Sequence, residues 1–169
     1  MTGPLLFESC VDSKAAALAS AEGGAGRLEL CARLDVGGTT PDASLVREVV
    51  TAVSIPVRVM VRPRGGSFVY DAEEQRAMAD AIAAMRDAGA HGIVTGALDA
   101  DGDVDAGPMR RFIEAAQPLP VTFHRAIDEA RDPLASLDVL LDLGVDRILT
   151  SGARARATDG AGTIAALVA

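Results

Sequence analysis

The sequence has 169 residues, of which 49% are apolar, so it fits a single domain with a sizeable core. Its formal net charge of -8 argues against nonspecific binding to nucleic acid or to anionic membranes. Because the start of the chain lacks the features of a signal peptide and no apolar run approaches the about 20 residues of a membrane span, we expect a cytosolic protein with reduced cysteines.

The first half of the chain predicts strands that alternate with helices. Strands are expected over residues 5–10, 27–31 and 57–66. Asp12 or Ser13 can cap the Ala-rich helix that follows the first strand. Thr40 followed by Pro41 predicts the start of the helix that precedes the third strand. The third run is apolar and rich in β-branched residues, which is typical of a strand buried on both faces of a parallel sheet.

The second half of the chain continues the alternation. Strands are expected over residues 92–96, 120–124 and 147–151. Helices are expected from Asp71, around residues 109–116, from Asp132 and over residues 163–169. Six strand–helix units predict an α/β protein with a parallel sheet and one domain over residues 1–169. Such a sheet is either an open doubly wound sheet or part of a (β/α)8 barrel, which needs about 250 residues when complete.

Two neighbouring predicted strands end with the same Glu-x-Cys pattern. The pattern is formed by Glu8 and Cys10 on the first strand and by Glu29 and Cys31 on the second. Alternate residues of a strand share one face and adjacent strands lie about 4.8 Å apart, so the two sulfurs can come within reach of one ion. Two thiolates suit Cu(I) or, with further ligands, Zn(II). The sequence leaves open the alternative that both are small buried apolar residues.

Further charged residues follow the third and fifth strands. Arg62 and Arg64 share one face at the end of the third strand, where they either bind an anion or form salt bridges. His124 ends the fifth strand and Asp128 follows in the loop. His124 can transfer protons, bind a metal beside the thiols, or pair with a glutamate of the Glu-x-Cys segments. His91 precedes the fourth strand and is expected at the opposite, stabilising end of the sheet.

Seven segments at or after the strand ends form a pattern along the chain, namely FESCVDS, RLELC, GGTTP, RPRGGSFVY, GIVTGALDADGDVD, PVTFHRAID and RILTSG. Taken together and in this order, they resemble the CutC family of copper homeostasis proteins. The resemblance implies a TIM barrel, a cytosolic location, self-association and Cu(I) binding, with the copper ligands of the family corresponding to Cys10 and Cys31. It also implies a charged rim that corresponds to Glu8, Glu29, Arg62, Arg64, His124 and Asp128.

The chain departs from the family in its number of strand–helix units. The family barrel has eight strands, whereas this chain ends after the sixth predicted strand, inside the next helix. An open parallel edge with uncovered apolar faces favours aggregation. We therefore expect either a fragment or an obligate homo-oligomer with six of the eight units.

Three functions are compatible with these observations. The leading hypothesis is a CutC-like cytosolic protein that binds Cu(I) through Cys10 and Cys31. The second is a TIM-barrel enzyme that acts on a small carboxylate or phosphate metabolite, in which the two arginines bind the anion and His124 with a glutamate transfers protons. The third is a non-catalytic assembly module.

Overall fold

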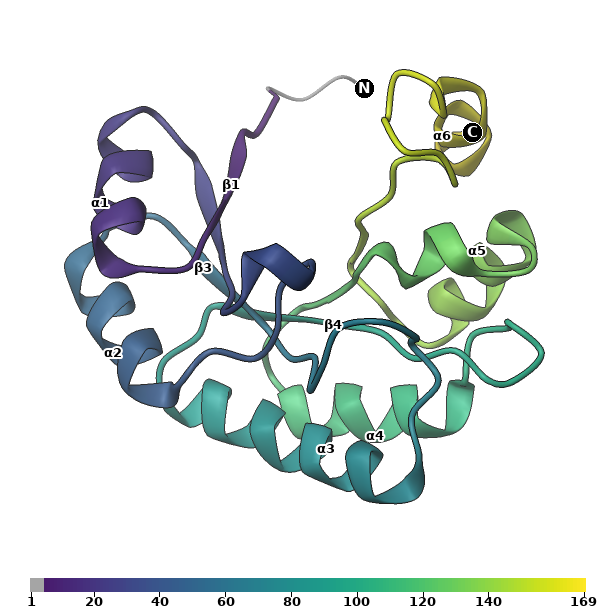
Figure 1. Cartoon of the computed structure of the whole chain (residues 1–169), viewed down its shortest axis with the longest axis horizontal. Helices are drawn as coiled ribbons and strands as arrows, with labels where there is room; N and C mark the ends of the chain where they lie inside the picture. Colours follow the sequence, from purple (N-terminus) through teal and green to yellow (C-terminus); the bar gives the residue numbers. More distant parts are fainter. Residues whose placement is uncertain (1–4) are drawn as a thin grey trace.

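The computed structural model describes residues 5–169, which form one curled sheet of six parallel strands (Figure 1). The strands are β1 (Glu8–Val11), β2 (Arg27–Leu30), β3 (Val57–Met60), β4 (Gly92–Thr95), β5 (Val121–Phe123) and β6 (Arg147–Ile148). They lie in the sheet in chain order, from β1 to β6. A doubly wound sheet reverses its strand order at a switch point, whereas a TIM barrel does not. The fold is therefore α/β and TIM-barrel-like, in the form of a half-barrel.

Helices connect the strands and lie on the outer side of the curve, where Figure 1 shows α1 to α5 following one another in an arc. The helices are α1 (Lys14–Glu22), α2 (Ala43–Ala52), α3 (Ala72–Asp87), α4 (Ala106–Ala116), α5 (Pro133–Asp142) and α6 (Ala161–Val168), with 3-10 turns η1 (Leu34–Val36) and η2 (Arg125–Glu129). Among the helices of the described residues, none is both long enough and apolar enough to cross a membrane.

Three predicted helix starts are confirmed by hydrogen bonds. Ser13 Oγ accepts from the backbone N–H of Ala16 at the start of α1. Asp71 and Glu74 form the predicted capping box of α3, and Asp132 caps α5. Each cap satisfies backbone N–H groups that have no partner within the helix.

The predicted start of α2 is wrong by two residues. The helix is preceded by Asp42 and not by Thr40. Thr40 Oγ1 instead donates to the carbonyl of Arg62 and accepts from the N–H of Arg62. Thr40 therefore attaches the loop before α2 to the segment that leaves β3, and it is not available as a helix cap.

The predicted strands extend too far at several ends. Strand β1 begins at Glu8, because residues 5–7 are exposed and contribute only one backbone hydrogen bond, from Gly26 to Phe7. Strand β3 ends at Met60. Val61 still donates to the carbonyl of Val94, but the backbone of Arg62 bonds to Thr40 in the loop before α2. The first shift places Glu8 at the amino end of β1, and the second leaves Arg62 and Arg64 beyond the carboxyl end of β3.

The two faces of the sheet have different chemistry. The outer face and the helices form one apolar core, which includes Leu28, Val59, Ile93, Phe112 and Phe123. The inner face carries the alternate residues of each strand, several of which are polar and buried. These residues are Glu29, Arg58, Thr122 and His124. Because buried polar groups need partners, the inner face is where a functional site is expected.

Candidate metal centre and adjoining pocket

Strands β1 and β2 bring three potential metal ligands together on the inner face. Cys10 is the register partner of Glu29, and Cys31 directly follows β2. The two Sγ atoms lie 3.6 Å apart. Oε1 of Glu29 lies 3.6 Å from Sγ of Cys10 and 3.7 Å from Sγ of Cys31. The three atoms therefore form a nearly equilateral triangle, which we call the thiol–carboxylate triad.

The size of the triad fits one metal ion. A point equidistant from three atoms 3.6 Å apart lies about 2.1 Å from each, which is 3.6 Å divided by √3. Metal–sulfur bonds are about 2.3 Å and metal–carboxylate bonds about 2.0–2.2 Å in zinc sites. An ion near the centre of the triad could therefore bind all three atoms with little rearrangement. The sequence predicted the two thiols as ligands but did not identify Glu29 as a candidate third ligand.

The triad holds protons when it is free of metal. The hydrogen bond with Cys10, followed by burial, raises the pKa of the Cys31 thiol far above its ordinary value. Burial and the nearby charge of Glu8 raise the pKa of Glu29, although hydrogen bonds from the thiols oppose the rise. Because a metal binds the thiolate, ion binding at this site must release protons.

The two cysteines differ in their access to solvent. Cys10 is exposed on β1, whereas Cys31 is buried in a small cluster with Met60 and Val94. A Cβ at Gly38 would lie 3.2 Å from Sγ of Cys31, so the glycine backbone covers this sulfur closely. Gly38 also has a φ of +87°, which favours glycine. The triad thus has one accessible thiol and one fixed, enclosed thiol.

Glu8 lies apart from the triad. It is the register partner of Arg27 at the amino ends of β1 and β2, and the two side chains form an ion pair. Glu8 is the first residue of β1, so its side chain lies at the amino end of the strand and away from the carboxyl ends. The two glutamates of the Glu-x-Cys segments therefore have different surroundings.

A pocket of about 790 Å³ adjoins the triad at the carboxyl ends of the strands. Five of the predicted site residues line it, namely Cys10, Glu29, Arg62, His124 and Asp128. Much of the remaining wall is apolar, formed by Leu34, Val36, Met60, Phe68, Leu149, Ala153 and Ala155. This volume lies within the range of about 300–1,000 Å³ that is usual for small-molecule sites.

The two arginines do not converge on this pocket. Arg62 is buried, donates to three backbone carbonyl groups and lies 4.7 Å above the ring of Phe68. Arg64 pairs with Glu74 at 2.6 Å, donates to two carbonyls of the following loop and is not among the residues that line the pocket. Because β3 ends before both residues, their shared parity in sequence does not bring the guanidinium groups together.

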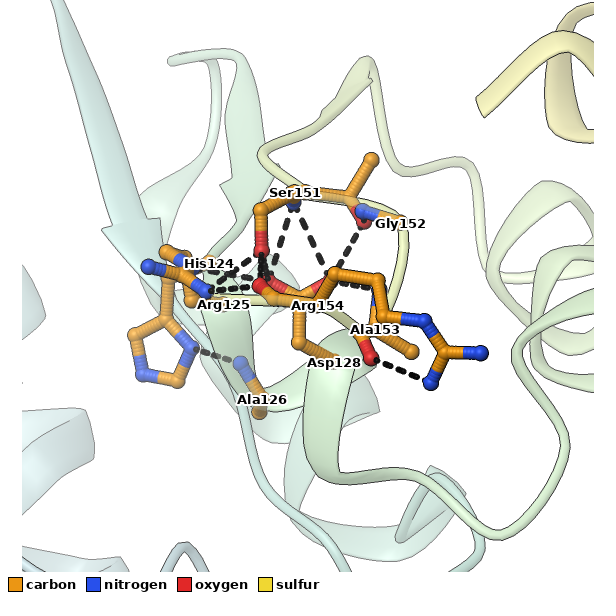
Figure 2. A network of polar contacts seen from close by, with 9 residues as sticks. His124, Arg125, Ala126, Asp128, Ser151, Gly152, Ala153 and Arg154 are labelled. Atoms are coloured by element: carbon orange, nitrogen blue, oxygen red, sulfur yellow. Dashed lines mark hydrogen bonds and ion pairs between the residues drawn. The ribbon is translucent and has the colours of Figure 1, made fainter. Parts of the chain in front are cut away.

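His124 is a buried, neutral histidine in the pocket wall. Its Nδ1 accepts from the N–H of Ala126 (Figure 2). The ring of His124 also packs against that of Phe68, with the two centroids 4.8 Å apart. Burial, followed by the charge of Arg62, lowers the pKa of His124 to about 3. Among the described residues, its Nε2 has no hydrogen-bond partner. His124 is not a member of the triad, and a ring that is neutral over the whole range around pH 7 is poorly suited to carry protons.

Asp128 organises the loop after β6. Its carboxylate accepts from Thr150, from the N–H and hydroxyl of Ser151, from the N–H of Ala153 and from Arg125 at 2.7 Å (Figure 2). Burial favours the protonated form, but the hydrogen bonds from Thr150, Ala153 and Arg125 outweigh it and lower the pKa of Asp128 to about 2. The partners in the loop lie 22–25 residues further along the chain, so sequence spacing did not reveal them.

Comparison with known sequences places the chain among CutC proteins. The pattern described as the CutC family matches residues 5–169. A family protein CutC of Xylella fastidiosa is 49% identical over 163 residues, which are 96% of this chain and 61% of that protein. The copper homeostasis protein cutC homolog of Homo sapiens is 45% identical over 163 residues, which are 96% of this chain and 60% of that protein. The chain thus spans about three fifths of the length of these relatives.

Comparison with solved structures agrees with the TIM-barrel-like fold. A CutC protein of Streptococcus agalactiae superposes with a TM-score of 0.90 at 32% identity, covering 97% of this chain and 82% of that one. A phosphoenolpyruvate phosphomutase of Streptomyces platensis superposes with a TM-score of 0.66 at 11% identity, covering 94% of this chain and 64% of that one. The second likeness concerns the barrel scaffold alone.

Proposed function

The chain belongs to the CutC family, and we propose that it binds copper as Cu(I) through Cys10 and Cys31. The observation that carries the proposal is the 3.6 Å separation of the two sulfurs, with the carboxylate of Glu29 at nearly the same distance from each. Copper homeostasis is the role named for the human relative. For this chain it is a proposal, and the triad supports it.

The ligand set favours a soft ion. Thiolate and thioether sulfur select Cu(I) and Zn(II), while carboxylate oxygen favours harder ions. Met60 packs against Cys31 and lines the pocket, so it adds a third sulfur to the neighbourhood of the triad. We propose that the binding of Cu(I) depends on the sulfur atoms, whereas the binding of Zn(II) depends on the carboxylate of Glu29 as well.

The unequal exposure of the two thiols suits the receipt and release of an ion. The exposed Cys10 is accessible for ligand exchange, and the buried Cys31 retains the ion while the other bond changes. Both thiols lose their protons on binding. A site of this kind binds a transferable ion more readily than it supports a permanent structural ion, which has four protein ligands.

An anaerobic titration with Cu(I) and a competing chelator tests the ligand assignment. We expect the double variant Cys10→Ser and Cys31→Ser to lose at least about 100-fold in Cu(I) affinity, because the loss of direct ligands costs more than the about 10- to 100-fold that follows a change in the residues supporting them. Glu29→Gln should leave the affinity for Cu(I) nearly unchanged and lower the affinity for Zn(II). If the double variant bound Cu(I) as tightly as the parent, the assignment would be wrong.

Location and assembly are also proposals. We propose that the protein acts in the cytosol and associates with itself, as the family resemblance implies. Large apolar side chains are exposed near the edge strand β6 and on α5 and α6, among them Leu141, Leu149 and Val168. Light scattering after size-exclusion chromatography tests self-association: a defined oligomer supports it, and a monomer at micromolar concentration contradicts it.

A further inference from the structure

We propose that the pocket beside the triad binds a small oxyanion, either a carboxylate or a phosphate group, and that Nε2–H of His124 donates a hydrogen bond to it. The site is distinct from the thiol–carboxylate triad, although both lie in one pocket. The proposal does not rest on copper binding and applies equally to the metal-free protein.

The protonation of His124 follows from its hydrogen bonds. Nδ1 accepts from the N–H of Ala126 at 3.3 Å, so Nδ1 carries a lone pair and not a proton. A neutral ring then carries its single proton on Nε2. Among the described residues this buried donor has no acceptor. A buried donor without a partner is unfavourable, and a ligand oxygen in the adjoining pocket would satisfy it.

The charge near His124 is positive. Arg62 is buried. Within residues 5–169 its three hydrogen bonds go to backbone carbonyls, and no carboxylate there forms an ion pair with it. The same charge disfavours protonation of His124. In the low dielectric of a buried site, an unpaired cation beside a neutral donor attracts an anion strongly.

The acidic residues of the pocket do not cancel this charge. Asp128 is paired with Arg125 and satisfied by the loop after β6. Oε1 of Glu29 accepts from the thiols of both Cys10 and Cys31 and is thus engaged within the triad. Glu129 and Arg154 also line the pocket and are opposite in charge.

Arg62 supplies a second unpaired donor in the same wall. Its Nε has no partner in the described part of the chain, and neither has the hydroxyl of Tyr70. Arg62 and His124 both line the pocket, so an oxyanion beside the ring of His124 also lies near the guanidinium charge.

The surroundings hold the imidazole in place. Phe68 contacts both the ring of His124, at an interplanar angle of 49°, and the guanidinium of Arg62, so the three side chains pack together. A Cβ at Gly96 would lie 2.8 Å from Nδ1 and Cε1 of His124, so only glycine leaves room for this ring position. A donor that is fixed before the ligand arrives binds it with less loss of entropy. The apolar walls favour an organic acid or a phosphate ester over a bare inorganic ion.

Calorimetry on the metal-free protein, with a chelator present, tests the proposal. The probes are inorganic phosphate and malonate, compared with chloride at equal ionic strength. We expect at least one oxyanion to bind and His124→Phe to weaken it by about 10- to 100-fold, the effect of losing a hydrogen bond to a charged group. His124→Gln, which retains an N–H donor, should recover part of the affinity. His91→Gln is the matched control. It should not change the affinity for either oxyanion, because His91 lies at the amino end of β3, where its Nδ1 accepts from the N–H of Val57.

Nitrogen NMR of the parent protein keeps the proposal testable if His124→Phe does not fold. The Nε2–H tautomer is expected, and its resonance should shift on addition of phosphate or malonate while that of His91 does not. Binding of phosphate alone or malonate alone identifies which oxyanion fits. An Nδ1–H tautomer, or binding of neither probe, would overturn the proposal without affecting the copper assignment, which is measured without these anions.

Discussion

The triad at β1 and β2 and the Asp128 network at β5 and β6 both lie at the carboxyl ends of strands, yet they differ in how fully their polar atoms are bonded. The atoms of the triad lie 3.6–3.7 Å from one another and hold exchangeable protons. The carboxylate of Asp128 accepts from two hydroxyls, two backbone N–H groups and a guanidinium. Groups with unused bonding capacity can bind a ligand, whereas saturated groups stabilise the fold. The difference separates a candidate binding site from a structural network within one pocket.

The largest expected effect is the loss of stability in Asp128→Ala. The substitution leaves Thr150, Ser151 and Arg125 without their shared acceptor, and we expect the free energy of unfolding to fall by about 3 kcal/mol. Urea denaturation measures it. The control Asp138→Ala, at an exposed position of α5, should change stability by less than about 0.5 kcal/mol. Copper affinity should be unchanged in both variants, and a loss of copper binding in Asp128→Ala would remove the distinction between the two regions.

The second largest expected effect is the loss of stability that the Asp128 network undergoes in acid. The folded-state pKa of Asp128 is about 2, below the about 3.9 of an unfolded chain. Its contribution to stability is therefore fully present above about pH 4 and is lost as the pH falls toward 2, with a size of about 2 kcal/mol. Unfolding measured from pH 5 to 2 should show this loss in the parent and a flatter profile in Asp128→Asn. Parallel profiles for the two proteins would contradict the assignment.

Gly96→Ala separates the histidine side of the pocket from the triad. The new Cβ would lie 2.8 Å from the ring of His124, so we expect about 1–2 kcal/mol of destabilisation. Gly162→Ala is the control, because a Cβ there meets no atom within 4 Å, and it should be neutral or stabilising by up to about 1 kcal/mol. Thermal unfolding measures both. Cu(I) affinity should be retained in Gly96→Ala, and equal stability of the two variants would show that His124 is not held against Gly96.

The smallest expected effect on stability is that of Glu29→Gln. Burial raises the pKa of Glu29 and so opposes its charged form, which makes a neutral amide of the same shape acceptable there, and we expect a change below about 1 kcal/mol. The same variant should lower the affinity for Zn(II), as proposed above. A large loss of stability in urea would place Glu29 with the structural groups and not with the triad.

The sequence predicted those parts of the site that depend on strand periodicity. Cys10 and Cys31 meet because both extend from the inner face of adjacent parallel strands, and this follows from parity and register alone. His91 lies at the amino end of β3, as expected, where it bonds to Val57. The alternation of elements predicted a parallel α/β sheet and left an open sheet and a barrel as alternatives. The barrel was implied by the resemblance to the CutC family, and the strand order from β1 to β6 agrees with it.

The parts that were not predicted depend on where strands begin and end. Arg62 and Arg64 separate because β3 stops at Met60, and Glu8 lies away from the pocket because β1 starts there. The partners of Asp128 come from a loop more than 20 residues away, which no local spacing indicates. Boundaries and loop contacts are set by tertiary hydrogen bonds, such as that of Thr40 with Arg62.

X-ray absorption spectroscopy of the Cu(I)-loaded protein is the most direct test of the thiol–carboxylate triad as a metal centre. We predict at least two sulfur ligands at about 2.3 Å in the parent, and their loss in the variant with Cys10→Ser and Cys31→Ser. A copper ion surrounded only by nitrogen and oxygen in the parent, or an unchanged spectrum in the double variant, would contradict the account.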